Sequence, residues 1–224
     1  MEYKTLCKGT KIPVLGLGTW QIGGRQEADY SEDKSNVEAI KKAVELGYTL
    51  IDTAETYGNG HTEELVGEAI KDVERKKLFI VSKVRKQNLG YEDLIASAKK
   101  SMERLHIQYF DLYLIHAPNP NIPLKETMKA MDKLVEDGLT KNIGVSNFSV
   151  AEMKEAQKYS KNKIVANQIQ YSLISRNKST YGDYVNMESE IIPYCQEKGI
   201  IVMADRPLHK GMLLEGKYPI LEQL

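Results

Sequence analysis

The chain has 224 residues, of which 31 are Lys or Arg, 31 are Asp or Glu and 42% are hydrophobic. This balance gives no reason to expect a nucleic acid or an acidic membrane surface as a partner, and the hydrophobic content is ordinary for a globular protein. No apolar run approaches the roughly 18 residues of a membrane span, and residues 1–4 do not begin a secretory signal. We therefore expect a cytoplasmic protein in which residues 1–224 form one domain.

The cysteines and histidines give no indication of a metal site. Cys7 and Cys195 are far apart in sequence and lack CxxC spacing, so we interpret both as plain thiols rather than as a disulfide or zinc ligands. His61 lies beside Glu63 and Glu64, but one histidine next to acids at a helix start is more often a charge pattern of the first turn. No metal ligands are predicted.

Residues 3–13 are predicted to form a hairpin that turns at Lys8-Gly9-Thr10. After it, apolar runs alternate with apolar residues at helical spacing, in repeats of roughly 30 residues. The runs predict seven strands, at 14–20, 48–52, 78–83, 110–116, 143–146, 164–168 and 200–204. The periodic segments predict helices at about 37–47, 65–73, 94–105, 128–135 and 150–159, and one that ends near Gly199.

This alternation is typical of a parallel sheet with helical crossovers. Seven consecutive units favour a closed (β/α) barrel of the TIM type over an open doubly wound sheet. The open sheet would also carry a dinucleotide-binding glycine fingerprint. Gly16 and Gly18 supply GxG, but Gln21 stands where the third glycine belongs. No linker or change in composition divides the chain.

Polar residues follow almost every predicted strand. Where parallel strands point their carboxyl ends to one face, these residues share a rim, which is where catalytic side chains of such folds collect. They are Trp20, Asp52 with Tyr57, Lys83, His116, Ser146 with Asn147, Gln168, and Asp205 with Arg206. Each alone has an ordinary explanation, such as a helix cap or a solvated charge. Together they predict an active site.

Four of these residues suit proton transfer to a carbonyl oxygen. A nearby ammonium, Lys83, should lower the pKa of the Tyr57 phenol by favouring phenolate, and Asp52 should keep that lysine charged and in place. A neutral His116 can orient a carbonyl by donating a hydrogen bond. Since no side chain can supply a hydride, a reduction would need a nicotinamide or a similar cofactor. The amides and hydroxyl of Ser146, Asn147 and Gln168 could bind a carboxamide.

Over essentially its whole length the chain resembles the aldo-keto reductase family. The resemblance rests on six segments in the family's order, namely 17–20 (LGTW), 51–58 (IDTAETYG), 81–83 (VSK), 114–116 (LIH), 143–148 (IGVSNF) and 167–171 (NQIQY). It implies that Asp52, Tyr57, Lys83 and His116 are a catalytic tetrad. It implies a carbonyl substrate, NADPH as hydride donor, and a hairpin that closes the far end of the barrel.

The same resemblance implies where the cofactor lies. Ser146, Asn147 and Gln168 match the positions that bind the nicotinamide carboxamide. We also assign Thr19, Trp20, Arg206 and Leu208 to the cofactor site. Arg206 could reach a pyrophosphate.

The chain differs from the family pattern in three places. Asp205 lies near where relatives commonly have an aromatic residue that stacks on the nicotinamide, and Ala117 replaces a tryptophan found in many, so the pocket should be wider there. The predicted (β/α)8 barrel also lacks its eighth strand and its carboxyl-terminal segment, with room only for one more helix from about Tyr218. We expect either a lost carboxyl terminus or a barrel completed by something else, and hence weak NADPH binding.

The leading interpretation is an enzyme that reduces aldehydes or ketones with NADPH, with Tyr57 as general acid. The alternative is a protein that keeps the barrel and the tetrad but acts as a cofactor sensor or scaffold with little turnover. A non-redox barrel enzyme such as an isomerase is disfavoured, because the sequence has neither a set of metal ligands nor a glycine-rich phosphate loop. The identity of the carbonyl substrate and the oligomeric state are left open.

Overall fold

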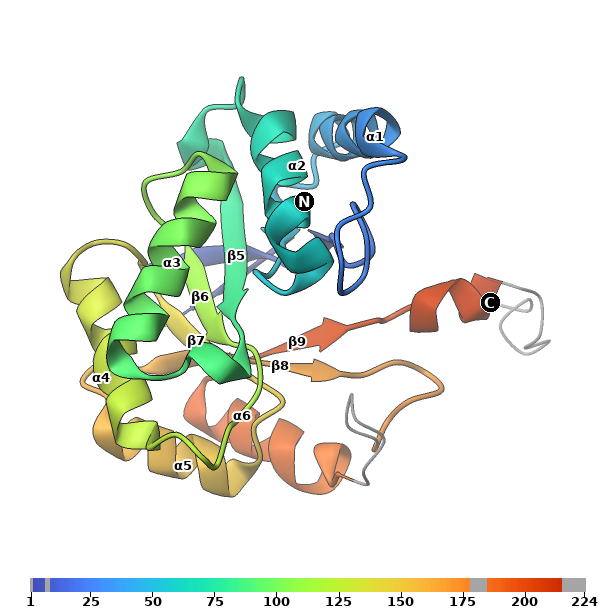
Figure 1. Cartoon of the computed structure of the whole chain (residues 1–224). Coiled ribbons are helices and arrows are strands. Elements are labelled where there is room, and N and C mark those ends of the chain that lie inside the picture. The colour runs from blue at the N-terminus through green and yellow to red at the C-terminus, as the bar shows by residue number, and fades with distance from the viewer. Residues whose placement is uncertain (1, 7–8, 178–184, 215–224) are drawn as a thin grey trace.

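The computed structural model describes residues 2–6, 9–177 and 185–214. It contains an amino-terminal hairpin followed by alternating strands and helices (Figure 1). Cys7, Lys8 in the hairpin turn, and the helix predicted from Tyr218 lie outside the described residues.

The hairpin consists of two short antiparallel strands, β1 (Tyr3–Thr5) and β2 (Lys11–Pro13), with Tyr3 opposite Pro13. The larger sheet has seven parallel strands in the order in which they occur along the chain. They are β3 (Gly16–Gly18), β4 (Leu50–Asp52), β5 (Phe79–Val84), β6 (Leu112–Ile115), β7 (Ile143–Ser146), β8 (Ile164–Gln170) and β9 (Ile201–Asp205). The predicted (β/α) barrel with an amino-terminal hairpin is confirmed.

Six α-helices of the described chain cross over between these strands and cover the outside of the sheet (Figure 1). They are α1 (Asp33–Glu45), α2 (His61–Ile70), α3 (Tyr91–Leu105), α4 (Leu124–Glu136), α5 (Val150–Tyr159) and α6 (Ile192–Lys198). A π-helical turn, η5 (Met187–Ile191), leads into α6. Within the described ranges, no helix is both long enough and apolar enough to cross a lipid bilayer.

The apolar core is divided by the sheet into an outer and an inner part. The outer part lies between the strands and the helices and is the larger of the two. The inner part lies inside the barrel, where Leu6 and Ile12 of the hairpin segment pack with inward-facing strand residues such as Phe79, Leu112 and Val165. The hairpin therefore fills one end of the barrel and leaves the other end for the site.

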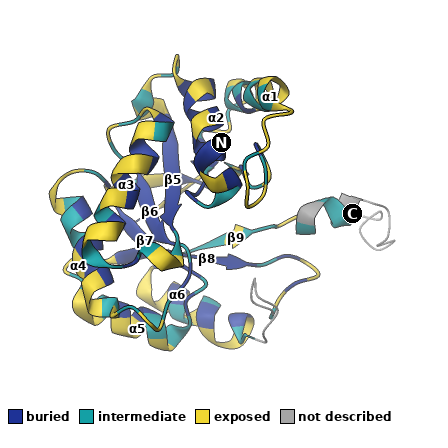
Figure 2. Ribbon diagram, viewed as in Figure 1, coloured by how far each residue is buried: buried dark blue, intermediate teal, exposed yellow. Residues whose placement is uncertain are grey.

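The two edge strands are less buried than the inner strands. All residues of β5 and β6 are buried, whereas β9 is mostly intermediate and β3 is mostly exposed (Figure 2). Since β3 and β9 are the ends of the strand order, the sheet formed by the described residues stays open between them. The inner strands thus have neighbours on both sides, and the edge strands on one.

Several predicted boundaries were too wide. The strand predicted at 14–20 is limited to Gly16–Gly18, because Val14 and Leu15 are apolar but remain 43% and 59% exposed outside the sheet. The strand predicted at 110–116 shortens to Leu112–Ile115, although Phe110 is buried and forms an isolated bridge with Thr140. Apolar runs indicate that a strand is present, but they do not show where its backbone pairing begins.

Candidate active site

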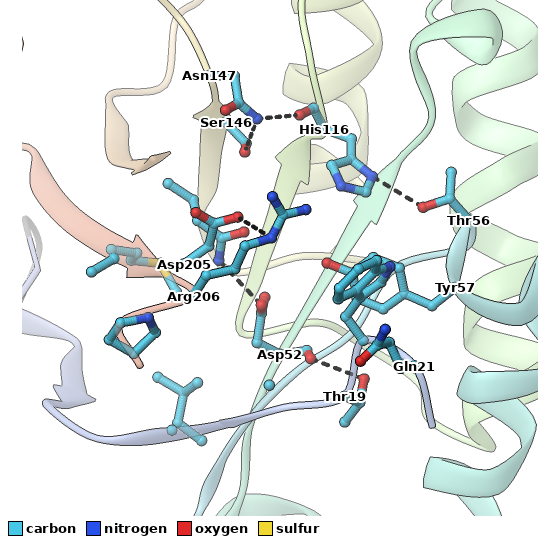
Figure 3. A pocket seen from close by; sticks show the side chains of 18 of the residues that line it. Thr19, Gln21, Asp52, Thr56, Tyr57, His116, Ser146, Asn147, Asp205 and Arg206 are labelled. Atoms are coloured by element: carbon cyan, nitrogen blue, oxygen red, sulfur yellow. Dashed lines mark hydrogen bonds and ion pairs between the residues drawn. The ribbon is translucent and has the colours of Figure 1, made fainter. Parts of the chain in front are cut away.

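A cavity opens at the rim formed by the carboxyl ends of the strands. Its volume is about 1580 Å³, and it extends from the rim between β3 and β9 as far as Lys4 and Ile12 in the hairpin. Such a cavity exceeds the roughly 300–1,000 Å³ of most small-molecule pockets. Asp52, Tyr57 and His116 all line it (Figure 3).

Lys83 connects two of these groups. It lies on β5, its side chain is fully buried, and its Nζ is 2.9 Å from Oδ1 of Asp52 at the end of β4. The same Nζ donates to the backbone carbonyl of Thr53 at 2.8 Å and to Oη of Tyr57 at 3.1 Å. The ammonium is therefore held by one ion pair and two hydrogen bonds. Burial alone would lower the pKa of Lys83, but Asp52 and Tyr57 outweigh it and raise the pKa well above its ordinary value.

Tyr57 is held in place by the turn that follows β4. Gly58 has a left-handed backbone (φ +52°), and a Cβ there would lie 2.5 Å from the Gly23 carbonyl, so the close approach of these two segments requires a glycine. The Gly58 amide donates to the carbonyl of Arg25 at 2.9 Å. The turn thereby fixes the phenol ring against Lys83, whose Nζ lies 4.9 Å from the ring centroid.

The expected fall in the pKa of Tyr57 is wrong. Burial of the phenol raises its pKa above the ordinary value of 10, and the opposing charge of Lys83 only reduces this rise, while Asp52 and Asp205 add to it. The sequence indicates the cation but does not show how completely the phenol is buried. The consequence is that Tyr57 is a protonated phenol at neutral pH.

His116 follows β6 and faces Tyr57 edge-on, with the ring centroids 5.7 Å apart and the planes at 76°. Its Nδ1 lies 3.3 Å from the hydroxyl oxygen of Thr56. Burial, together with the positive charges of Lys83, Arg206 and Arg85, lowers the pKa of His116 to about 3. The imidazole is therefore neutral at physiological pH, as the sequence predicts.

Ser146, Asn147 and Gln168 lie together at the ends of β7 and β8, and all three line the cavity. The Asn147 side-chain amide donates to Ser146 Oγ at 2.9 Å and to the carbonyl of His116 at 3.2 Å (Figure 3). Gln168 donates from Nε2 to Oδ2 of Asp52 at 3.2 Å. These three residues thus form hydrogen bonds with two of the four predicted catalytic residues, Asp52 and His116.

Thr19 and Trp20 come from the segment after β3. Thr19 is fully buried and donates from both its amide and its hydroxyl to the carbonyl of Asp52, each at 3.0 Å. Trp20 has a cation as its neighbour, since the guanidinium carbon of Arg206 lies 5.0 Å from the indole centroid. The contact between Trp20 and Arg206 links the segments that follow the two edge strands.

Arg206 and Leu208 belong to the turn after β9. Arg206 has a positive φ of 50°, donates to Oε1 of Gln170 at 3.0 Å and lies 3.9 Å from a carboxylate oxygen of Asp205. Leu208 is 52% exposed and lines the mouth of the cavity. All eleven residues assigned to the site by sequence therefore occur around one cavity, since Lys83 reaches it through Asp52 and Tyr57.

Two other residues of the site were not assigned a role from the sequence. Asp205 was noted as a strand-end residue and as a departure from the family pattern, and its carboxyl lies close enough to interact electrostatically with Tyr57 and Lys83, while burial raises its pKa. Thr56 was not singled out, although it lies within the segment around Tyr57 and its hydroxyl contacts His116. Both residues lie next to a predicted site residue, since Thr56 precedes Tyr57 and Asp205 precedes Arg206.

His61, considered above as a metal ligand, lies on the outer side of the site. Its Nδ1 is 2.9 Å from Oε2 of Glu64, and its Nε2 is 2.8 Å from Oδ1 of Asp33 at the start of α1. Glu63 points elsewhere, to Arg104 and Ser82. The histidine thus joins α1 to α2 instead of grouping with both acids of its own helix.

Comparison with known proteins agrees with this geometry. Residues 14–222 match the model of the aldo/keto reductase family. Methylglyoxal reductase YeaE of Escherichia coli (strain K12) is 39% identical over 207 residues, which are 92% of this chain and 68% of YeaE.

Solved structures give the same result. The thermostable aldo-keto reductase Tm1743, in complex with the inhibitor epalrestat, superposes with a TM-score of 0.91 at 46% identity, over 100% of this chain and 79% of that one. An aldo/keto reductase from Klebsiella pneumoniae, in complex with NADP and acetate, superposes with a TM-score of 0.82 at 32% identity, over 97% and 74% of the two chains. This chain is a member of the aldo/keto reductase family of oxidoreductases.

Proposed function

We propose that the protein reduces aldehydes or ketones to alcohols with NADPH, and that Tyr57 protonates the carbonyl oxygen. The observation that carries this proposal is the contact of Lys83 Nζ with both Asp52 Oδ1 (2.9 Å) and Tyr57 Oη (3.1 Å), beside a neutral imidazole. When bound, NADPH would supply a hydride to the carbonyl carbon. The overall reaction consumes one proton and gives an alcohol and NADP⁺.

Each of the four residues has a separate task. Tyr57 is a protonated phenol at neutral pH and gives its proton to the substrate oxygen as that oxygen gains charge. Lys83 donates a hydrogen bond to the same Oη and so stabilises the phenolate that is left behind. Asp52 keeps the buried ammonium charged. Water then restores the proton of Tyr57.

His116 is assigned to orienting the substrate. Its pKa of about 3 means that only one ring nitrogen carries a proton at neutral pH. If the Thr56 hydroxyl donates to Nδ1, the proton is on Nε2, and that nitrogen can donate to a carbonyl oxygen. A neutral donor beside Lys83 also avoids a second buried positive charge.

The chemistry of the donor set fits the nicotinamide end of the cofactor. A carboxamide needs both donors and acceptors, which Ser146, Asn147 and Gln168 provide within a few ångströms of Asp52 and His116. Arg206 is the cation at the open side that could meet a phosphate. We assign Thr19, Trp20 and Leu208 to the walls of the same site.

Replacing Tyr57 by Phe tests the proposal. The hydroxyl is lost but the ring remains, so kcat/KM for aldehyde reduction should fall by roughly 10²–10⁴, the contribution typical of a general acid. The cofactor should still bind, as measured by quenching of Trp20 fluorescence, because Trp20 is the single tryptophan and lines the cavity. Unchanged turnover in Tyr57→Phe would show that the assignment is wrong.

A second candidate is a cofactor sensor or scaffold with little turnover. The observation in its favour is the guanidinium of Arg206, which lies over the Trp20 ring inside the cavity that a cofactor would enter. Incubation of the protein with NADPH and a panel of aldehydes, followed by the loss of NADPH absorbance, separates the two functions. A sensor would bind NADPH without consuming it.

A further inference from the structure

A second pocket opens beside the candidate active site. It has a volume of about 360 Å³ and lies between the ends of β6, β7 and β8 and the π-helical turn η5. Lys86, Ala117 and Asn147 line both this pocket and the main cavity. The two spaces therefore meet beside His116, the residue assigned to hold the carbonyl. We refer to the second space as the side pocket.

Most of the residues that line the side pocket are apolar. The apolar ones are Ala117, Pro118, Phe148, Ile169, Val185, Met187 and Ile191, most of them buried, and the polar ones are Lys86, Asn147, Ser149 and Glu152. One carboxylate, that of Glu152, also lines the pocket. It already accepts hydrogen bonds from the amide and the hydroxyl of Ser149, both at 2.7 Å, in the capping box of α5. The surface left for a ligand thus favours an apolar group.

The residue at the junction is small. Ala117 follows His116 directly and is only 3% exposed, so its methyl group forms the wall between the carbonyl position and the side pocket. An apolar cavity of about 150 Å³ is enough to hold benzene. The side pocket is more than twice that size. A phenyl ring or a medium-length alkyl chain would fit.

We infer that the side pocket receives the apolar tail of the carbonyl substrate, so that the protein prefers aryl or medium-chain alkyl aldehydes to very small ones. This inference rests on the proposed carbonyl reduction. A substrate whose oxygen meets Tyr57 and His116 would pass its tail across Ala117 and place it against Phe148, Ile169 and Met187. Val185, which is half-buried, also lines the pocket.

Turnover of a series of straight-chain aldehydes, from propanal to decanal, measures the effect. Each methylene that enters the side pocket should raise kcat/KM by about two- to fourfold, until the pocket is full and the curve levels off. Val185→Phe should place a larger side chain in the pocket and lower the ratio of kcat/KM for octanal to that for propanal by at least tenfold. A series without any rise overturns the inference.

Val37→Phe is the matched control. Val37 is also a half-buried valine packed against the core, but it lies on α1, far from the side pocket (Figure 1). In Val37→Phe, the ratio of kcat/KM for octanal to that for propanal should equal the ratio in the unmodified protein. This control separates filling of the pocket from a general effect of a larger side chain. Equal ratios in Val185→Phe and Val37→Phe would overturn the inference.

Failure of the proposed function would look different, because then no aldehyde of any length would be reduced. In that case calorimetry with 1-octanol tests the side pocket without turnover. Binding of octanol to the unmodified protein and to Val37→Phe, with loss in Val185→Phe, would retain the pocket as an apolar binding site. Equal binding to all three proteins, or binding to none of them, would remove it.

Discussion

Lys83 and Arg206 are two cations at the same site, but they are held in different ways. Lys83 lies on an inner strand, is fully buried, and has three polar partners within 3.1 Å. Arg206 follows an edge strand, keeps 24% of its side chain exposed, and has one hydrogen bond at 3.0 Å together with the looser contacts to Asp205 and Trp20. Both strands end at the same rim.

The difference follows from strand pairing. β5 has a neighbour on each side, so the backbone around Lys83 is fixed and its side chain is enclosed by other strands and by the turn at Tyr57. β9 is paired only with β8, and Trp20 follows β3, which is paired only with β4. We therefore expect the residues proposed for proton transfer to be rigid and the edge residues to adapt to a ligand.

The largest expected effect comes from replacing Lys83 by Met. The change leaves the Asp52 carboxylate in a mostly buried position without its ammonium, and removing one member of a buried pair costs about 3–5 kcal/mol. Arg206→Met, at the edge, should cost only about 1 kcal/mol or less, because its ion pair is long and partly exposed. Unfolding in urea measures both free energies.

A second variant identifies the cause. If the unpaired charge is what destabilises Lys83→Met, the double variant Lys83→Met with Asp52→Asn should recover part of the lost free energy of unfolding, since the amide is neutral. If the double variant is no more stable than Lys83→Met, the destabilisation comes from lost packing instead of from the unpaired charge. If the unfolding free energies of Lys83→Met and Arg206→Met lie within 1 kcal/mol of each other, the contrast between the inner cation and the edge cation is wrong.

The presence of each strand was easier to predict from the sequence than its bounds. Strands such as Leu112–Ile115 are uninterrupted apolar runs, because both faces are covered, and their ends carry the polar residues that indicated a site. At the edge, Val14 and Leu15 are equally apolar but exposed, so the prediction of β3 extended too far. The sequence does not say which apolar residues have a neighbouring strand.

The sequence indicated which residues lie around the cavity, but not their electrostatics. Strand ends and family motifs pointed to Asp52, Tyr57, Lys83 and His116, and the structure brings these four together. The direction of the pKa shift of Tyr57 depends on its burial, which a sequence does not show. Glu63 is a similar case, because it looked like a surface acid of the first turn. It is in fact fully buried against Arg104, 41 residues away.

His61→Gln should have the next largest effect, and one that changes with pH. Asp33 and Glu64 flank the ring, and Asp29 lies nearby. Although burial opposes the charge, the two hydrogen bonds outweigh it and raise the pKa of His61 above 6.5. The charged histidine therefore stabilises the fold fully below pH 6.5, and this stabilisation is lost as the pH rises through the folded-state pKa.

Losing these charged hydrogen bonds should lower the unfolding free energy by about 1–3 kcal/mol at acidic pH, or several degrees in melting temperature. Thermal unfolding of the unmodified protein and His61→Gln at pH 5.5 and pH 8.5 measures the difference. The difference in melting temperature between the two proteins should be larger at pH 5.5. A difference in melting temperature that increases toward pH 8.5 would mean that His61 is neutral in the folded protein.

Arg206→Met should have a smaller effect, seen at His116. Arg206 is one of three cations that lower the pKa of His116, but burial is the largest cause. The pKa should therefore rise from about 3 in the variant while staying well below 6.5. An NMR titration of the imidazole protons measures this, with Lys198→Met as the control because Lys198 is a surface cation of α6. An unchanged pKa would show that the edge has no influence on the inner residues.

The smallest expected effect is an absence of pH dependence near neutrality. Tyr57 must be protonated to act, and its pKa is raised above 10, so this requirement fails only in alkali. His116 must be neutral, and its pKa of about 3 means that this requirement fails only in acid. The measurement uses one aldehyde and a subsaturating concentration of NADPH. Between pH 5 and pH 9, kcat/KM for this aldehyde should change by no more than about twofold. A step near pH 6.5 would instead indicate a histidine with an ordinary pKa, and the enclosure of His116 by the inner strands would then not govern the site.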